Sequence, residues 1–370
     1  MNVILVRSRA SDPNVLKIAH VLAKNGIETK LLIWDRNGKN EDALLNKISI
    51  RYFRMAAPYD KATVVFCLPF WWLYEFFFLL KNADRDTVIH ACDLDTLWPA
   101  IFVKILKRIR LNYTIYDFYA DNLPNKTPRI FRDFIAFIEK KGLQFAHTVF
   151  LVDESRLAQI KEAKFNNIVY IYNTPEDVHR DNYPEPRTDR GEMIIFYAGV
   201  LHESRGLLQI IQAVESIKNV KFIIAGNGPK QHLFDKPDPS IAEKIQYIGW
   251  IPYNEVINYT LNSDCIIALY DPVIPNNHYA SPNKLFEAMM CGKPIIVNDG
   301  TSMADTVRKE NCGLIVLYAD IIAIKHAILT LKEDPEKCRQ FGVNGRNAYE
   351  RKYSWKIMEG RILAAYQKIS

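Results

Sequence analysis

Short apolar runs alternate with segments of helical periodicity along almost the whole chain, and this alternation limits the possible folds more than any other feature. The apolar runs are four to six residues long and rich in Val and Ile, as expected for strands that are buried on both faces. The helical segments supply the connections that parallel strands need. The pattern predicts an α/β architecture, in which helices cover both faces of parallel sheets. The predicted strands are 3–6, 29–34, 88–91, 113–116, 148–152, 168–172, 193–198, 220–225, 264–269, 294–297 and 313–317.

One stretch breaks this alternation. Residues 173–191 (NTPEDVHRDNYPEPRTDRG) contain three prolines and have no apolar periodicity, which is typical of a linker. With 370 residues, the chain is long enough for one α/β domain on each side of this linker, each with its own core. Doubly wound domains bind ligands beyond the carboxyl ends of their strands. The strand-to-helix loops are therefore where functional residues are expected.

Two loops of the second half carry small and polar residues directly after a predicted strand. In the first, Gly199 opens a loop that contains Arg205 and leads into a helix, and a helix N-terminus beside an arginine suits a phosphate. The second includes Gly226, Asn227 and Gly228, where glycine permits close backbone approach. In each loop a tight turn without a ligand is at least as good an explanation.

A third loop, residues 281–297, is the most informative. Ser281 is expected to cap a short helix with Pro282 in its first position. Lys284 and Glu287 then lie one turn apart on the same helix face. A cation there can meet a pyrophosphate, and a carboxylate can hold a ribose diol. The alternative is an ordinary exposed Lys–Glu pair.

Seven segments of the chain match, in order, the motifs of one known family. They are Asp12-Pro13-Asn14-Val15, 88–97 (VIHACDLDTL), Tyr116-Asp117, Tyr197-Ala198-Gly199 with Arg205-Gly206, 224–229 (IAGNGP), Tyr247-Ile248-Gly249 and 283–294 (NKLFEAMMCGKP). With these segments the chain resembles the retaining glycosyltransferases of family four, which have the GT-B fold. The resemblance covers nearly the whole chain.

This resemblance implies a GT-B fold, with two doubly wound Rossmann-like domains and a cleft between them. In the family the C-terminal helix crosses back to the first domain, and the helix after Tyr353-Ser354-Trp355 fits this role. The expected acceptor-side domain is therefore 1–174 plus 354–370, and the expected donor-binding domain is 175–353. The implied activity is transfer of a sugar from a UDP- or GDP-sugar to a hydroxyl acceptor, with retained anomeric configuration, no cofactor and no obligatory metal.

The resemblance also implies roles for individual residues. Glu287 would bind the donor ribose, and Arg205 and Lys284 would neutralise the departing diphosphate, while the backbone N–H groups of residues 281–283 would cradle phosphate or sugar. The candidate catalytic residues are Arg205, Lys284, His90 and Asp117. The expected donor site comprises Gly199, Arg205, Gly226, Asn227, Gly228, Ser281, Pro282, Asn283, Lys284, Leu285 and Glu287. The expected acceptor side comprises Asp12, His90, Asp93, Asp117 and Asp121, where structural hydrogen bonds are an equal alternative.

The chain departs from the family pattern at three positions. Tyr279 stands in place of the first Glu of the family's Glu-x7-Glu motif, Val200 in place of an Arg, and Cys92 in place of the second His of a His-Ala-His pattern. Candidate substitutes for the missing Glu are Asn276, Asn277 and His278.

Other interpretations of the same residues stay open. A nucleotide-sugar epimerase of the same fold would bind the same donor but would need acid/base groups around the sugar, and a non-catalytic protein could bind the nucleotide sugar alone. Asp93 and Asp95 form an Asp-x-Asp sequence, which is the metal motif of the other major glycosyltransferase fold. Their position between a buried strand and a helix favours helix caps instead.

Charge and aromatic patterning indicate the kind of acceptor. Residues 100–145 hold nine basic and four acidic residues, with Phe131, Phe134 and Phe137 among them. This segment either lies on an anionic membrane surface or forms a solvated face with its aromatic side chains turned inward. A glycan or lipid-linked acceptor is expected. The net charge of +6 is modest and no recognition motif is present, so nucleic acid is not an expected partner.

The apolar segment 62–80 (ATVVFCLPFWWLYEFFFLL) has nearly the length of a membrane span. Pro69, Glu75 and the charged residues from Lys81 onward favour a buried or surface-lying helix instead. The six cysteines are scattered, which fits free thiols in a reducing compartment, and the first residues lack the pattern of a signal peptide. We expect a cytoplasmic protein, with or without association with the cytoplasmic face of a membrane.

Overall fold

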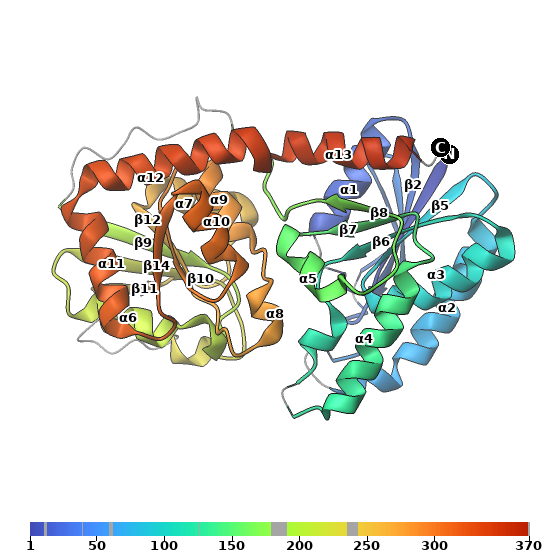
Figure 1. The fold of residues 1–370 in the computed structure, drawn as a ribbon, viewed down its shortest axis with the longest axis horizontal. Coiled ribbons are helices and arrows are strands. Elements are labelled where there is room, and N and C mark those ends of the chain that lie inside the picture. The colour runs from blue at the N-terminus through green and yellow to red at the C-terminus, as the bar shows by residue number, and fades with distance from the viewer. Residues whose placement is uncertain are drawn as a thin grey trace. The chain divides into compact units, whose positions relative to one another are not determined.

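The chain folds into two compact units. The computed structural model describes residues 1–10, 13–38, 40–58, 62–124, 126–178, 191–234 and 243–368. Unit 1 comprises Met1–Tyr172 and Met358–Ser370, and unit 2 comprises Asn173–Ile357. Both units are parallel α/β layers (Figure 1), which confirms the predicted architecture.

Unit 1 is built on an eight-stranded sheet with the order β3-β4-β2-β1-β5-β6-β7-β8. Neighbouring strands are parallel except β3 and β4, which are antiparallel. No predicted strand corresponds to β3 or β4, because the edge strand β3 is exposed and β4 next to it alternates buried with exposed residues instead of forming an apolar run. The strands are β1 (Asn2–Arg7), β2 (Glu28–Asp35), β3 (Ala43–Leu45), β4 (Ile48–Arg54), β5 (Thr87–Cys92), β6 (Arg110–Ile115), β7 (Thr148–Leu151) and β8 (Asn167–Tyr170).

The helices of unit 1 cover both faces of this sheet. Helix α1 connects β1 to β2, whereas α3 connects β5 to β6 and α4 connects β6 to β7, in the opposite direction across the sheet. Because such crossovers are right-handed, α1 lies on one face of the sheet and α3 and α4 lie on the other. The α-helices of unit 1 are α1 (Pro13–Lys24), α2 (Leu68–Asn82), α3 (Leu94–Lys107), α4 (Arg129–Leu143) and α5 (Leu157–Ile160), and α13 (Trp355–Gln367) brings the chain back from unit 2. Shorter 3-10 turns are η1 (Ala62–Phe66), η2 (Tyr119–Asn122) and η3 (Glu154–Arg156).

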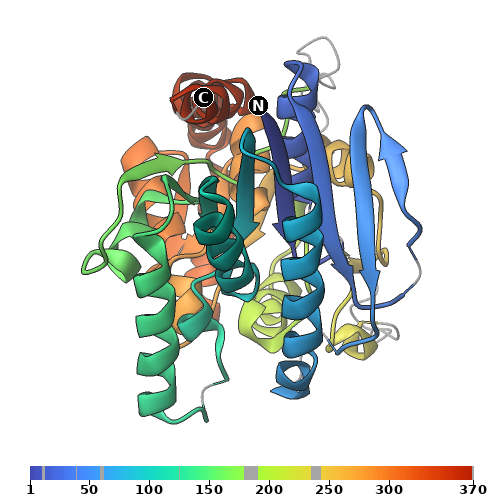
Figure 2. The same ribbon diagram turned by 90° about the vertical axis from the view of Figure 1, so that its right-hand side faces the viewer.

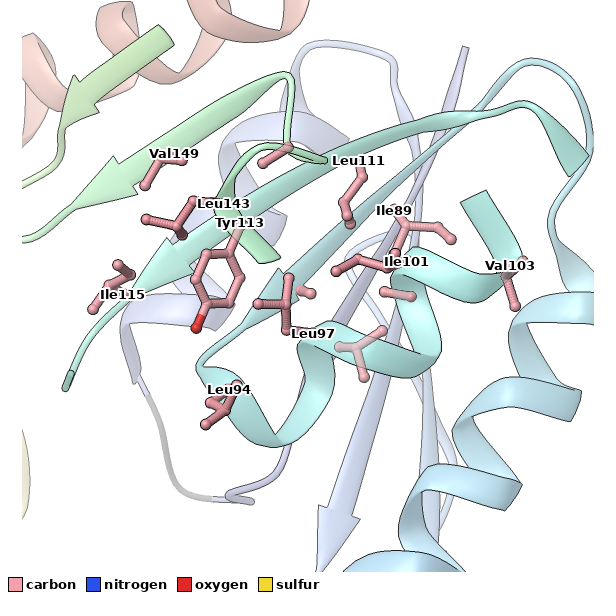
Figure 3. Packing of buried hydrophobic residues seen from close by; sticks show 14 of the residues in the cluster. Ile89, Leu94, Leu97, Ile101, Val103, Leu111, Tyr113, Ile115, Leu143 and Val149 are labelled. Atoms are coloured by element: carbon pink, nitrogen blue, oxygen red, sulfur yellow. The ribbon is translucent and has the colours of Figure 1, made fainter. Parts of the chain in front are cut away.

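The core of unit 1 is packed between α3 and the sheet. Figure 3 shows Leu97 and Ile101 of α3 close to Leu111 and Tyr113 of β6. Helix α4 approaches α3 closely at Gly142, where a Cβ atom would lie 2.4 Å from Leu97 Cδ2. A larger residue at this position would push the two helices apart.

The segment 62–80 forms η1 and most of α2, and it packs on unit 1 through Trp71, Glu75 and Leu79. The prediction of a buried or surface-lying helix is therefore confirmed. Among the described residues, no helix combines the length and the apolar character that crossing a membrane requires.

Unit 2 contains a six-stranded parallel sheet with the order β11-β10-β9-β12-β13-β14. Each predicted strand of this half corresponds to one of these strands, and β11, three residues long at the edge, was not expected. The strands are β9 (Met193–Ala198), β10 (Val220–Ala225), β11 (Ile245–Tyr247), β12 (Cys265–Ala268), β13 (Ile295–Asn298) and β14 (Gly313–Val316). The α-helices are α6 (Leu207–Glu215), α7 (Tyr253–Asn262), α8 (Pro275–His278), α9 (Asn283–Met290), α10 (Ser302–Glu310), α11 (Ile321–Glu333) and α12 (Pro335–Ala348), with the turns η5 (Glu203–Arg205), η6 (Gln231–Leu233) and η7 (Tyr349–Tyr353).

Candidate active site

A pocket of about 450 Å³ lies at the carboxyl ends of the strands of unit 2. Its walls come from the loops after β9, β10, β11 and β12 and from the first turns of α7 and α9. These loops meet because parallel strands end at the same edge of a sheet. The lining residues are Ala198, Gly199, Val200, Arg205, Ala225, Gly226, Asn227, Trp250, Ile251, Tyr253, Val256, Tyr270, Pro282, Asn283, Lys284 and Glu287.

Two of the loops touch each other through glycine backbone. Gly226 has a φ of +129°, and a Cβ atom on it would lie 1.9 Å from the carbonyl oxygen of Gly199. The loops after β9 and β10 are joined by the N–H of Gly199, which donates to the carbonyl of Ala225 (3.0 Å). Only glycine fits here, so the two loops approach each other closely at the wall of the pocket.

Lys284 is the most deeply placed cation of the pocket. It lies in the first turn of α9 and is 7% exposed. Its Nζ atom is 4.1 Å from the ring centroid of Tyr197 and 5.5 Å from that of Tyr270. Within the described part of the chain, no carboxylate forms an ion pair with this ammonium group. Its positive charge is therefore held by aromatic faces and is available to an anion.

Arg205 supplies a second cation at the end of η5. Its Cζ atom lies 3.8 Å above the ring centroid of Tyr270, and its Nη1 atom donates to Asn277 Oδ1 at 3.2 Å. Asn277 in turn donates to the carbonyl of Asp271 (2.8 Å). Asn277 thus holds the guanidinium in place, and neither it nor Asn276 or His278 lines the pocket as a substitute for the missing Glu.

Glu287 lies one turn after Lys284 on α9 and is buried at the pocket wall. Its carboxylate is hydrogen-bonded to the hydroxyl of Tyr253 in α7, and burial together with this carboxylate raises the pKa of that tyrosine. The sequence placed the lysine and the glutamate on one helix face, which the structure confirms. The pair is buried, so the alternative of an exposed surface pair is wrong.

The aromatic part of the pocket was not expected from the sequence. Trp250, Tyr253 and Tyr270 line it, and Tyr197 lies behind Lys284. Trp250 is 68% exposed, which is unusual for a tryptophan and is typical of a binding surface. One signal was available: Trp250 follows the Tyr247-Ile248-Gly249 motif directly.

Three residues of the predicted donor site, Ser281, Leu285 and Gly228, do not line the pocket. Ser281 does not cap α9, which begins at Asn283 with Pro282 in the cap position, and its hydroxyl is buried without a hydrogen-bond partner. Leu285 points into the core and its N–H donates to the carbonyl of Pro282. Gly228 packs against Leu201. Pro282 lines the pocket but has no N–H to donate, so residues 283 and 284 carry the first N–H groups of the helix.

His90, predicted as a catalytic residue of the acceptor side, is a structural residue. It is completely buried, with Nδ1 2.5 Å from the hydroxyl of Tyr366 and Nε2 2.6 Å from Thr114 Oγ1. Burial lowers its pKa to about 3. A neutral ring with both nitrogens in hydrogen bonds holds α13 to β5 and β6 and has no free atom for a substrate.

The predicted acidic residues of the acceptor side are tied to the scaffold of unit 1. Asp93 stands in the N-cap position of α3, but its side chain accepts no hydrogen bond from the helix. Instead, Oδ1 accepts from the N–H groups of Tyr116 (2.8 Å) and Asp117 (3.2 Å), and Oδ2 is paired with Arg7. Asp95 accepts from Ser8, so the two aspartates of the Asp-x-Asp sequence are structural rather than caps.

Two further acidic residues face the same strand edge, and one lies outside the described residues. Asp117 Oδ1 is 3.3 Å from Arg156 Nη2, and Asp121 Oδ2 accepts from Gln159 at 2.5 Å. Asp117 keeps part of its carboxylate exposed, so it stays a candidate. Asp12 lies outside the described residues.

Residues 179–348, most of unit 2, match the family model of the glycosyl transferases of group 1. This part of the chain is therefore similar to the group 1 glycosyl transferases. The similarity agrees with the resemblance that the sequence motifs indicated.

Two relatives of the chain are named as glycosyltransferases. It is 20% identical over 184 residues to the lipopolysaccharide core biosynthesis glycosyltransferase LpsD of Rhizobium meliloti, a match that covers 49% of this chain and 51% of LpsD. The chain thus spans about half the length of this relative. It is 22% identical over 325 residues to the N,N'-diacetylbacillosaminyl-diphospho-undecaprenol alpha-1,3-N-acetylgalactosaminyltransferase of Campylobacter jejuni, which covers 81% of this chain and 82% of that protein.

Solved structures of similar fold establish the architecture of the whole chain. The sucrose-phosphate synthase of Thermosynechococcus elongatus superimposes with a TM-score of 0.78 at 17% identity, over 100% of this chain and 99% of that one. Anabaena HepE in complex with UDP superimposes with a TM-score of 0.73 at 12% identity, over 100% of both chains. These neighbours are GT-B glycosyltransferases, and the expected GT-B fold is confirmed.

Proposed function

We propose that the protein transfers a sugar from a UDP- or GDP-sugar to a hydroxyl acceptor, with retention of the anomeric configuration. One observation carries this proposal: the pocket of unit 2 holds two cations, Lys284 and Arg205, against aromatic rings and beside an N-terminal helix turn. Cations and helix N-terminal N–H groups together suit a diphosphate. Glu287, one turn deeper, suits the ribose diol.

The names of the similar proteins support the nucleotide and the type of acceptor. The HepE structure contains UDP. The relative LpsD acts in lipopolysaccharide core biosynthesis, and the Campylobacter relative is named for a diphospho-undecaprenol substrate. We therefore propose a glycan or lipid-linked acceptor. The six cysteines, all of which lie in the described part of the chain, form no disulfide, and we propose the reducing environment of the cytoplasm as the location of the reaction.

The proposed reaction needs charge stabilisation more than acid/base groups. The bond between the anomeric carbon and the β-phosphate oxygen breaks, the acceptor oxygen forms a bond to that carbon from the same face, and the acceptor proton passes to the departing phosphate. Lys284 and Arg205 would stabilise the charge that develops on this phosphate, and such pre-set cations are commonly the largest catalytic contribution. With two cations in this role, we propose that no metal ion or cofactor is obligatory.

Nucleotide release from a panel of UDP- and GDP-sugars, with and without lipid-linked saccharide acceptors, tests the proposal. We expect acceptor-dependent release of one nucleotide and, by NMR, a product with the anomeric configuration of the donor. Arg205→Ala and Glu287→Ala each lower the turnover by ~10-fold or more, because each removes a group that contacts the donor.

Lys309→Ala is the matched control, since Lys309 is an exposed lysine of α10 away from the pocket. It keeps the activity of the unaltered protein. Conversion of the donor to its epimer without nucleotide release would instead show an epimerase. Donor binding without any turnover would show a binding protein, and a product of inverted configuration would disprove retention.

A further inference from the structure

The outer surface of unit 1 carries many large apolar side chains. They belong to three helices, α2, α3 and α4, and to the turn before α2. Phe70 is 61% exposed, Phe77 57% and Phe134 55%. The exposed residues of this kind are Val65, Phe66, Phe70, Leu73, Phe77, Phe102, Ile105, Leu106, Ile130, Phe131, Phe134 and Phe137. A contiguous apolar surface of this size marks an interaction site.

Helix α2 carries large apolar residues on both its buried and its exposed face. Its inward positions Trp71, Glu75 and Leu79 are buried against unit 1 at a spacing of four residues. The residues Phe70, Leu73 and Phe77 repeat at three and four residues and point outward. The packing of the core does not require aromatic residues at these outward positions. In residues 100–145, Phe131, Phe134 and Phe137 are exposed as well, so the alternative of a face whose aromatic side chains turn inward is wrong for that segment.

Helix α4 repeats the arrangement. Ile130, Phe134 and Phe137 share one face and are exposed, and Lys141 continues the same face. The Lys141 Nζ atom lies 5.3 Å from the ring centroid of Phe137. A cation and an aromatic ring side by side at an exposed position are typical of residues that reach the boundary between lipid and water.

The three helices form one layer, so their exposed faces are continuous. Helix α3 contacts both α2 and α4, and Figure 1 shows all three beside the sheet of unit 1. In Figure 2 the blue α2 and the green α4 run nearly parallel to each other. Phe102, Ile105 and Leu106 of α3 lie in the same layer and are exposed.

Charge on this layer is one-sided. Three of the four acidic residues of α2, α3 and α4 are buried: Glu75, Asp95 and Glu139. Glu139 is held by the hydroxyl of Tyr113 (2.7 Å) and the N–H of Tyr119 (3.0 Å). Asp133, the fourth, is 3.6 Å from Arg129. The basic residues of the layer are Lys81, Lys104, Lys107, Arg129, Arg132, Lys140 and Lys141, and all of them reach the surface.

We propose that this layer docks on an anionic lipid surface. Apolar side chains that project among lysines and arginines enter the headgroup region, while the cations meet the negative charge of the lipid. A second copy of the chain fits less well, because a symmetric interface would bring two cationic surfaces together with Asp133 as the exposed acid of each layer. The anionic lipid is the occupant that matches both the apolar and the charged part of the surface.

Co-sedimentation with vesicles tests this surface directly. We expect the protein to sediment with vesicles of phosphatidylglycerol and phosphatidylcholine, to stay in the supernatant with phosphatidylcholine alone, and to dissociate as salt is raised. The variant Phe70→Ser, Phe77→Ser, Phe134→Ser lowers the partition coefficient by ~10-fold or more, because it removes three inserting side chains. Lys81→Glu with Lys141→Glu lowers it as well, through charge.

The matched control is Leu208→Ser, Ile322→Ser, Val343→Ser, which removes three exposed apolar residues of unit 2 and leaves vesicle binding unchanged. Thermal unfolding shows that each variant is folded. The proposal is overturned if the protein does not sediment with anionic vesicles at low salt, or if both serine variants lose the same binding. Concentration-dependent dimers that the first variant abolishes, without vesicle binding, would overturn it in favour of a second copy. The assay uses no sugar donor, so it stands apart from the proposed transferase activity.

Discussion

Replacement of Lys284 by methionine separates the contribution of this lysine to catalysis from its contribution to stability. The ammonium group is nearly buried and lies 4.1 Å from the Tyr197 ring centroid. Contact with the rings stabilises a desolvated cation by about 2 kcal/mol, while burial of a charge costs several kcal/mol. Methionine keeps the length and the apolar contacts of the chain. The free energy of unfolding of Lys284→Met is therefore expected to stay the same or to rise by about 1 kcal/mol.

The expected effect on catalysis is much larger and has the opposite sign. A cation about 4 Å from a unit negative charge contributes about 4 kcal/mol at the effective dielectric constant of a protein surface. Loss of one pre-set group at a developing charge lowers the rate by ~10²–10³. We expect kcat/KM of Lys284→Met to fall by this factor, with Arg205 as the remaining cation.

Nucleotide release under donor-limited conditions and urea unfolding measure the two effects on the same preparation. Lys309→Met is the control, because it removes an exposed lysine of the same unit. It should change neither quantity. Lys284→Met with near-normal kcat/KM and a loss of stability of about 2 kcal/mol or more would refute the reasoning, since Lys284 would then be a packing residue.

Three other substitutions test structural statements made above. Gly226→Ala forces a Cβ atom onto the carbonyl of Gly199, so it should destabilise unit 2 by about 2 kcal/mol or more in a urea titration and abolish donor turnover. The control is Gly360→Ala, whose Cβ atom would meet no neighbour within 4 Å; it should leave the free energy of unfolding unchanged or raise it. Burial raises the pKa of Glu139 to about 8 in the folded protein. In the unfolded chain the same carboxyl group ionises at about pH 4.5, so between these two pH values only the unfolded state has lost the proton. Stability of unit 1 therefore falls by up to ~1.4 kcal/mol per pH unit toward pH 8, and Glu139→Gln should remove that fall; an unchanged slope would contradict the buried neutral acid. His90→Ala should lower the stability of unit 1 by roughly 2–4 kcal/mol but leave the Kd of the donor nucleotide, measured by calorimetry, unaltered.

The donor pocket was largely predictable because its main residues follow strands that the apolar runs reveal. Gly199, Gly226 and Lys284 belong to separate loops, yet parallel strands that end at one edge bring them together. Trp250 and Tyr270 were missed because an aromatic residue in a sequence is more often part of a core than of a pocket.

The acceptor side was predicted less well, because a polar residue at a strand end can contact either a substrate or another residue of the scaffold. The sequence placed His90 at a strand end, but it lies inside β5 and its partner Tyr366 is 276 positions away in the sequence. Asp93 pairs with Arg7, 86 positions away. No local pattern reveals such contacts, whereas the strands and helices themselves follow from periodicity.

Unit 1 is discontinuous in the sequence, and this affects the order in which the two units can be completed during synthesis. Residues 358–370 of unit 1 are made after the whole of unit 2, and α13 supplies the buried Met358, Ile362 and Tyr366. A ribosome-bound chain can therefore finish the sheet of unit 2 while the hydroxyl that pairs with His90 has not yet been translated. Until then the residues of β5 and β6 that pack against α13 stay uncovered. Unit 1 is therefore the first unit whose synthesis begins and the last whose folding can be completed.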